Sequence, residues 1–278
     1  MTAIREAAAV TGAASGIGRA LAIELSARGC DLALADRDEA GLQAVAAEIA
    51  KAHSRKVSIH RVDVGEPGEI AAFAQAAIAE HPSLNIVVNN AGVALLGGFG
   101  EIDQSQMDWL MNINFWGVVH STRAFLPHLA TRPEAHIVNL SSIFGIIGPP
   151  GQTAYAASKF AVRGFSESLR HELQMAGSPV RLSVVHPGGV ATNIARNSRT
   201  GSGVADNARR SETIERFDRV AKTSPQAAAL RIIDGIEKDQ PRILIGSDAR
   251  MMDLLQRFRP GTYWAVLAKR IEKIANKK

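Results

Sequence analysis

The stretch Val10–Gly18, VTGAASGIG, is the part of the sequence that decides the fold. It joins a short apolar run to an alanine-rich amphipathic segment through a turn that contains three glycines. Glycine allows a tight turn and close approach of backbone to a phosphate, and the N-terminus of a following helix offers free N–H groups and a partial positive charge. The glycine spacing is GxxxGxG, and by itself this pattern fits an ordinary strand-to-helix turn equally well.

On both sides of this turn, short β-branched or aliphatic runs alternate with helical segments. The seven runs that we predict as strands are Ala8–Val10, Leu32–Leu34, Val57–Val62, Ile86–Val88, Ile137–Leu140, Leu182–Val185 and Ile243–Ile245. Helical connections of this length favour right-handed crossovers between parallel strands, with helices on both faces of the sheet. The sequence therefore predicts an α/β fold, a doubly wound seven-stranded parallel sheet of the Rossmann type, as a single domain over residues 1–248.

Two helices are predicted to be the longest and to pack on the same face of the sheet, about Asp103–Leu129 and about Gln152–Met175. Between residues 192 and 222 the pattern breaks into RNSRTGSGVADNARR, followed by a short amphipathic piece. This composition predicts a mobile lid over a site, and a plain surface loop is the alternative.

Composition limits the class of protein. The chain has 278 residues, 46% of them hydrophobic, enough for one large core, and its single cysteine, Cys30, excludes an internal disulfide. The first residues lack the apolar run of a secretory signal, so we expect a cytoplasmic protein. No apolar stretch approaches the roughly 20 residues needed to span a bilayer. The scattered histidines and the absence of CxxC or HExxH spacing predict no metal site.

The net charge of +5 is unevenly distributed. Residues 249–278 carry eight Lys or Arg against Asp253 and Glu272, so this tail has a charge of +6 and the rest of the chain −1. A body without a basic face argues against nucleic-acid binding. Within the tail, apolar residues at helical spacing predict two amphipathic helices broken at Pro260–Gly261. They would cover a substrate pocket, pack against another subunit, or rest on an anionic membrane surface.

Asp36 supports the interpretation of the glycine turn as a dinucleotide site. It ends the predicted second strand about 20 residues after the glycines, where an acid accepts hydrogen bonds from ribose hydroxyls, although it could also cap the next helix. A 2′-phosphate about 4 Å from this carboxylate would cost roughly 4 kcal/mol at an effective dielectric near 20. We therefore predict NAD, with NADP possible through Arg37. The residues expected at the phosphates are Gly12, Ser15, Gly16, Ile17 and Gly18.

Two further strand ends fit the same cofactor slot. Asp63 and Val64 follow the third predicted strand, where the acid would accept from an adenine amino group or cap the helix that begins near Pro67. After the fourth strand come Asn90, Ala91 and Gly92, small residues that let the backbone approach a ligand and that alone would indicate only a turn.

Tyr155 and Lys159 lie four residues apart on a predicted helix, so their side chains share one face. Lowering a phenol pKa from about 10 to about 7 takes roughly 4 kcal/mol, which a nearby ammonium and a cationic nicotinamide could supply. The pair alone is more typical of a half-buried aromatic beside a solvated lysine. Ser142 favours the chemical interpretation, because it ends the fifth strand at the edge where parallel strands meet a ligand.

Together the motifs resemble the short-chain dehydrogenase/reductase family. The motifs that carry the resemblance, in order, are TGAASGIG, Asp63, NNAG, Asn114 in MNINFWG, NLSS ending at Ser142, YAASK and HPGGVAT, over about residues 7–248. The resemblance implies hydride transfer between a nicotinamide cofactor and a secondary alcohol or ketone. It also implies a homodimer or homotetramer packed through the long helices.

The resemblance assigns roles to individual residues. Tyr155 is similar to the catalytic acid/base of the family, Lys159 to the residue that lowers its pKa and binds the nicotinamide ribose, and Ser142 to the donor that polarises the substrate oxygen. Asn114 resembles the residue that holds a helix-bulge water in a proton relay to Lys159. The residues expected beside the nicotinamide are Pro187, Gly188, Val190 and Thr192, with Thr192 on the carboxamide. His186 and His120 are interpreted as structural.

Apolar residues flank the expected centre, namely Val93–Leu96 after NNAG and Ile143–Pro149 after Ser142. They predict a pocket for a lipophilic substrate, sterol-like or a long-chain alcohol, unless they are ordinary core and subunit contacts. The alternatives are reduction of a small polar carbonyl compound, or a non-catalytic dinucleotide-binding scaffold that regulates a partner.

Overall fold

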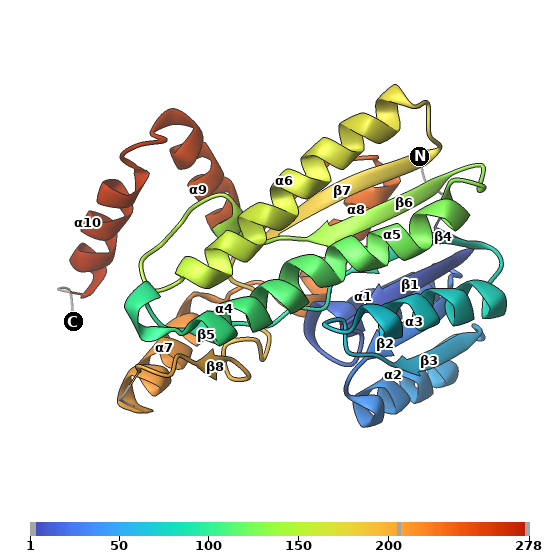
Figure 1. The fold of residues 1–278 in the computed structure, drawn as a ribbon, viewed down its shortest axis with the longest axis horizontal. Helices are drawn as coiled ribbons and strands as arrows, with labels where there is room; N and C mark the ends of the chain where they lie inside the picture. Colours follow the sequence, from blue (N-terminus) through green and yellow to red (C-terminus); the bar gives the residue numbers. More distant parts are fainter. Residues whose placement is uncertain (1–3, 205–206, 276–278) are drawn as a thin grey trace.

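The structure is a computed structural model, which describes residues 4–204 and 207–275. Its centre is a seven-stranded parallel sheet in the order β3-β2-β1-β4-β6-β7-β9. The strands are β1 Ala7–Thr11, β2 Asp31–Asp36, β3 Val57–Arg61, β4 Leu84–Asn89, β6 Ala135–Leu140, β7 Val180–Pro187 and β9 Arg242–Ile245. All seven predicted strands are present, and the predicted doubly wound fold is confirmed (Figure 1).

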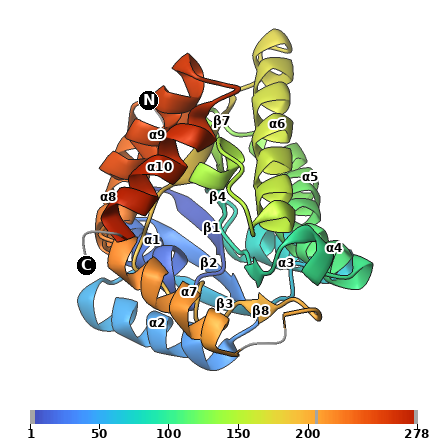
Figure 2. The same cartoon turned by 90° about the vertical axis from the view of Figure 1, so that its left-hand side faces the viewer.

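Helices cover both faces of this sheet, and each face has its own core (Figures 1 and 2). On one side lie α1 Gly16–Ala27, α2 Glu39–Ala52 and α8 Pro225–Glu237, and on the other α3 Pro67–Glu80, α5 Gly117–Leu129 and α6 Thr153–Met175. Strand β1 shows the division, because Ala8 and Val10 join the first core while Ala7 and Ala9 join the second. This alternation is the two-residue period of a strand buried on both faces.

The predicted helix over Asp103–Leu129 is interrupted. It begins as α4 Gln104–Met111, passes through the π-helical turn η2 Asn112–Trp116 and continues as α5. A π-turn accommodates one extra residue in the helix and frees backbone groups from the regular hydrogen-bond pattern. Asn114 lies inside this turn, so the irregularity falls at a predicted site residue.

Residues 192–222 are more regular than their composition suggests. Strand β8 Arg199–Thr200 pairs in parallel with β5 Leu95–Leu96, and α7 Asn207–Val220 follows. The short pairing is supported by Arg199, whose guanidinium lies 3.9 Å from the centre of the Trp109 ring. Two-residue strands have no hydrophobic period of their own, so a sequence pattern does not reveal them. The segment is thereby fastened beside the residues that follow NNAG.

The remaining elements are η1 Phe99–Glu101, η3 Ile143–Gly145, α9 Ser247–Phe258 and α10 Tyr263–Ala275. Helices α9 and α10 are separated at Pro260–Gly261, as the tail sequence predicts. Among the described residues, no helix combines the length and the apolar character that crossing a membrane requires.

Candidate functional site

The glycine turn lies between the carboxyl end of β1 and the N-terminus of α1. Gly12 and Gly16 have φ of +66° and +56°, values that residues with a Cβ rarely adopt. A Cβ on Gly12 would lie 2.7 Å from the Asn90 Nδ2 and 2.8 Å from the Ala91 Cα. A Cβ on Gly18 would overlap the carbonyl oxygen of Gly12. Ser15 is the N-cap residue of α1, but its side chain makes no capping bond. The first N–H groups of an α-helix, here including that of Ile17, have no partner within the helix, and a phosphate could accept from them.

Thr11 fastens this turn to the turn after β4, and sequence reasoning missed it. Its hydroxyl accepts hydrogen bonds from the backbone N–H of Asn90 and of Ala91, both at 3.1 Å. The Asn90 amide in return donates to the carbonyls of Thr11 and Gly12, at 2.9 and 3.0 Å. The signal in the sequence was a hydroxyl residue ending a buried strand. These bonds hold two of the predicted cofactor-binding turns in one fixed arrangement.

Asp36 is placed beside the glycine turn. Its Oδ2 accepts from the Ala14 N–H at 3.0 Å, and its Oδ1 accepts from the Asp38 N–H at 3.1 Å. The cap of α2 is Asp38, which accepts from the Gly41 N–H, so the capping alternative for Asp36 does not hold. Each Asp36 oxygen keeps acceptor capacity for a ligand hydroxyl. Arg37 follows Asp36 in the chain and is exposed.

Asp63 and Val64 lie near the same turn. The Asp63 carboxylate accepts from the Gly65 N–H at 2.8 Å, and the N-cap of α3 is Glu66, so Asp63 is not its cap. A narrow hollow brings Val64 together with Thr11, Ala91 and Ile113. Of these residues, Thr11 and Ile113 were not among the predicted cofactor contacts.

The predicted chemical centre lies where β6 ends and α6 begins. The Ser142 hydroxyl accepts from the Phe144 N–H at 3.1 Å and is hydrogen-bonded to the Tyr155 side chain. The Lys159 Nζ lies 5.8 Å from the centre of the Tyr155 ring and donates to the Leu140 carbonyl at 3.0 Å. The structure thus brings together Ser142, Tyr155 and Lys159, although Ser142 and Lys159 are 17 positions apart in the chain.

Burial controls the ionisation of this centre. It raises the pKa of Tyr155 to about 12, against a smaller lowering by the Ser142 hydrogen bond. Burial also lowers the pKa of Lys159 to about 8. Both shifts disfavour the charged form of a group that has lost water. At neutral pH the phenol alone is a proton donor, and it becomes a base only when further positive charge stabilises the phenolate.

Asn114 is fully buried and fixes the backbone beside Lys159. Its Oδ1 accepts from the Val93 N–H at 2.8 Å, and its Nδ2 donates to the Val93 carbonyl at 3.0 Å and to the Ser158 hydroxyl at 3.1 Å. A Cβ on Gly92 would lie 3.2 Å from the Asn114 Oδ1 and 3.4 Å from the Lys159 Nζ. Asn114 and Lys159 therefore converge on one backbone position, which must be small.

The end of β7 and the turn after it lie beside both Ser142 and the glycine turn. The His186 Nδ1 donates to the Ser142 carbonyl at 2.9 Å, and burial lowers the pKa of this histidine to about 4, so the ring is neutral. The backbone N–H of Gly189 donates to the Asp248 carboxylate at 2.7 Å. A Cβ on Gly16 would touch the Thr192 side chain at 3.2 Å, which places Thr192 against the glycine turn.

The other predicted residues of this turn fall in the same place. Pro187 ends β7, a Cβ on Gly188 would overlap the Asp248 carboxylate, and Val190 forms a parallel bridge with Thr223. Sequence reasoning missed Asp248, which follows the last strand with no motif around it.

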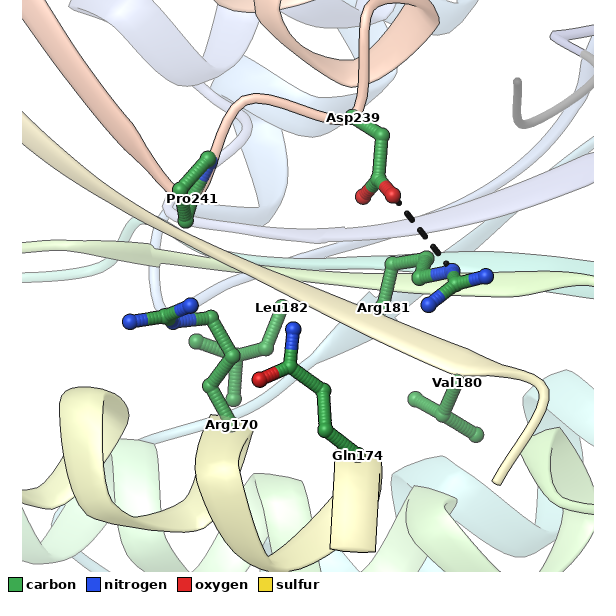
Figure 3. Close-up of a pocket in the computed structure, with 7 residues that line it drawn as sticks. All are labelled: Arg170, Gln174, Val180, Arg181, Leu182, Asp239 and Pro241. Atoms are coloured by element: carbon green, nitrogen blue, oxygen red, sulfur yellow. Dashed lines mark ion pairs between the residues drawn. The ribbon is translucent and has the colours of Figure 1, made fainter. Parts of the chain in front are cut away.

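A separate hollow of about 50 Å³ lies at the opposite end of β7 (Figure 3). Residues from α6, from the first half of β7 and from the segment before β9 line it, and it contains an ion pair of 3.4 Å between Arg181 and Asp239. It holds no nucleophile beside a base, so we do not assign the chemistry there. Within residues 4–204 and 207–275, no group of His, Cys, Asp or Glu is arranged to hold a metal ion.

Comparison with known proteins agrees with this geometry. The model of the family described as short chain dehydrogenase matches residues 6–203. The putative oxidoreductase SadH of Mycobacterium tuberculosis is 43% identical over 267 residues, 96% of this chain and 95% of the relative. The dehydrogenase/reductase SDR family member 7B of Mus musculus is 30% identical over 95% of this chain and 80% of the relative.

Solved structures of short-chain dehydrogenases are also similar to this chain. A short chain dehydrogenase/reductase from Burkholderia phymatum in complex with NAD has a TM-score of 0.84 and 29% identity, covering 93% of this chain and 95% of that one. A metagenomic short-chain oxidoreductase in complex with NADP has a TM-score of 0.69 and 29% identity, covering 86% and 96%.

Proposed function

We propose a substrate class, residue roles and a cofactor preference for this chain, which belongs to the short-chain dehydrogenase/reductase family and is an NAD(P)-dependent oxidoreductase acting on CH–OH groups. The proposed substrate is a lipophilic secondary alcohol or the matching ketone. The observation that carries the proposal is the apolar environment on both sides of the Tyr155 ring.

One side of Tyr155 is formed by residues that follow NNAG and by α4. Leu95, Leu110 and Ala154 form a buried cluster against which Val93 and Tyr155 pack. Burying each CH₂ of a substrate among such side chains contributes about 0.8 kcal/mol. A polar substrate would lose hydrogen bonds to water there and find few replacements.

The other side is formed by the segment after Ser142. The Phe144 ring meets the Tyr155 ring edge-on, with 6.1 Å between centroids. Ile143, Ile146 and Ile147 are buried behind it in a cluster with Leu267 of the tail. The Tyr263 hydroxyl of α10 accepts from the Gly148 N–H at 2.9 Å, which fastens this segment from outside. The tail therefore packs against the segment that we propose as the pocket wall.

The residues of the glycine turn fit a dinucleotide. The turn combines positive-φ glycines, a helix N-terminus and the acceptor oxygens of Asp36, so the turn would hold the phosphates and Asp36 the adenosine ribose. A 2′-phosphate beside Asp36 would cost roughly 4 kcal/mol, which supports NAD over NADP. When bound, the nicotinamide supplies the acceptor or donor of hydride.

The proposed roles of this chain's residues follow from their positions. Tyr155 exchanges the proton with the substrate oxygen at its phenolic oxygen, and Ser142 donates a hydrogen bond to that oxygen as charge develops on it. Lys159 holds positive charge near the phenol. Asn114 fixes the position of the Val93 backbone relative to Lys159. His186 holds Ser142 through its carbonyl. Catalysis then consists of positioning and of electrostatic stabilisation.

Two expectations about the surroundings remain proposals. We infer that residues 192–222 form a lid over the substrate site, because Thr192 lies against the glycine turn and β8 is paired with β5. We also infer a homodimer or homotetramer through the long helices, because Trp116 and Phe160, on η2 and α6, are exposed by 46% and 41%. The lid is tested by limited proteolysis, which should cut residues 192–222 more slowly when NAD is present. The oligomer is tested by the solution mass of a Phe160→Glu variant, which should be lower than that of the wild type.

The substrate proposal is tested with NAD reduction over secondary alcohols of increasing chain length. Because each buried CH₂ contributes about 0.8 kcal/mol, kcat/KM is expected to rise about fourfold per carbon until the pocket is filled. The variant Tyr155→Phe is the control for background reduction. A panel in which only small polar alcohols react would contradict the lipophilic substrate class.

A further inference from the structure

The outer face of α9 carries apolar side chains that no described part of the protein covers. Leu254 and Phe258 lie one helical turn apart and are exposed by 55% and 82%, and Val266 on α10 is exposed by 39%. The inner face of the same helices packs on the pocket wall through Ala249, Met252 and Leu267. Figure 1 shows α9 and α10 at the left end of the molecule, beyond the N-terminal end of α6.

Cations surround this outer face, and in the described part of the chain only Arg257 among the three arginines beside Leu254 and Phe258 is paired with a carboxylate, that of Asp253. Arg250 precedes Leu254 by one turn, while Arg257 and Arg259 flank Phe258. Among the described residues Arg250, Arg259 and Lys269 form no ion pair, and every exposed side chain described over 249–269 is apolar, cationic or neutral.

The two acidic residues of α9 are engaged elsewhere, and Asp248 accepts a hydrogen bond from the Gly189 N–H. Asp253 is 5% exposed and is paired with Arg242 and Arg257. Among the side chains described over 249–269, no carboxylate is therefore available on the outer face to neutralise a second set of cations. A symmetric contact between two copies would bring arginines together and be repulsive.

An anionic lipid surface fits both properties of this face. Leucine and phenylalanine on one side of a short helix, with arginines beside them, form the pattern that rests in the interface between lipid headgroups and acyl chains. Cations near an anionic leaflet each strengthen binding, and the effect falls off within a Debye length. A nucleic acid would offer phosphates to the arginines but no apolar layer for Leu254 and Phe258.

We propose that the outer face of the α9–α10 tail binds the surface of an anionic bilayer, with Leu254 and Phe258 inserted and Arg250 and Arg259 on the headgroups. Because the inner face of these helices supports Ile143–Ile147, docking places the pocket wall beside the lipid. An apolar alcohol dissolved in the membrane then has a short path to the site. That last step rests on the proposed function, whereas the binding itself does not.

The test is co-sedimentation of the full chain with phosphatidylcholine vesicles, with and without phosphatidylglycerol. Wild-type protein should bind the phosphatidylglycerol vesicles and be released by salt. The double variant Leu254→Ser/Phe258→Ser, and separately Arg250→Glu/Arg259→Glu, should each bind at least about tenfold more weakly. The matched control is Met175→Ser, because Met175 is 90% exposed at the far end of α6, and its binding should equal the wild type.

Solution mass and reduction of NAD with a water-soluble alcohol are measured on the same variants and should not change. The proposal is overturned if wild type ignores phosphatidylglycerol vesicles or if the Leu254/Phe258 variant binds like wild type. It is equally overturned if that variant changes the oligomeric mass, because the face is then a subunit contact. Vesicle binding without any alcohol oxidation would leave this proposal standing and contradict the substrate class alone.

Discussion

Replacing Lys159 with methionine should favour the folded protein more at neutral pH than at high pH, although it removes a side chain with a proposed role in the site. Lys159 is 4% exposed, and burial lowers its pKa from 10.5 to about 8. The folded state therefore binds this proton less tightly than the unfolded state does. The destabilisation is complete below pH 8 and disappears as the pH rises through 10.5, because stability rises with pH wherever the unfolded state binds more protons.

The magnitude follows from the shift. A difference of roughly 2.5 pKa units at 1.36 kcal/mol per unit is about 3 kcal/mol. The lost hydrogen bond to the Leu140 carbonyl costs about 1 to 3 kcal/mol at every pH, so the absolute stability of the variant is a less direct measure than its pH dependence. We expect the difference in unfolding free energy between wild type and Lys159→Met to change by about 3 kcal/mol between pH 7 and pH 10.5.

The measurement is urea unfolding of the cofactor-free protein at several pH values in this range. Tyr155 and Cys30 also contribute to the pH dependence, because burial raises the pKa of each to about 12 in the folded protein, whereas the ordinary values of 10.0 and 9.0 apply to the unfolded chain. Both proteins share this contribution, so it cancels in the difference. The exposed Lys51, changed to methionine, gives the background. A pH-independent difference between wild type and Lys159→Met would refute the account of Lys159 as a desolvated ammonium.

Three further changes test the site. Tyr155→Phe should lower kcat by at least about a hundredfold while NAD affinity by calorimetry stays unchanged, and a kcat near wild type would remove Tyr155 from the proton transfer. Asp36→Ala should raise the NADP-to-NAD ratio of kcat/KM at least about tenfold, because it removes a repulsion of up to roughly 4 kcal/mol; an unchanged ratio would contradict the role of Asp36. Gly12→Ala should abolish NAD binding and lower stability by about 2 kcal/mol or more, since its φ is +66° and the new Cβ would lie 2.7 Å from Asn90. Gly68→Ala is the matched control: Gly68 lies in the first turn of α3 with nothing within 4 Å of an added Cβ, so alanine should not lower stability or NAD binding.

The sheet and its class were predictable because each buried parallel strand is a short continuous apolar run in the sequence. Runs such as Ile86–Val88 are apolar on both faces, and the helices between them keep their own period. The closeness of the candidate site residues was predictable for a related reason, because parallel strands end at one edge and each motif follows a strand. Thr11, Asp248 and the pairing of β5 with β8 were missed, because their partners lie far away in sequence and leave no local pattern.

What the sequence determined by itself was therefore the architecture, the family and which side chains meet near Tyr155. Only the tertiary structure decided the environment of those side chains. The Tyr155 pKa of about 12 and the Lys159 pKa of about 8 both come from burial, which depends on everything packed around them. The structure also decided which way the tail faces, with the Tyr263 hydroxyl bonded to the Gly148 N–H and Phe258 exposed to solvent. A helical period shows that a helix has two faces, but what each face meets depends on packing with segments distant in the chain.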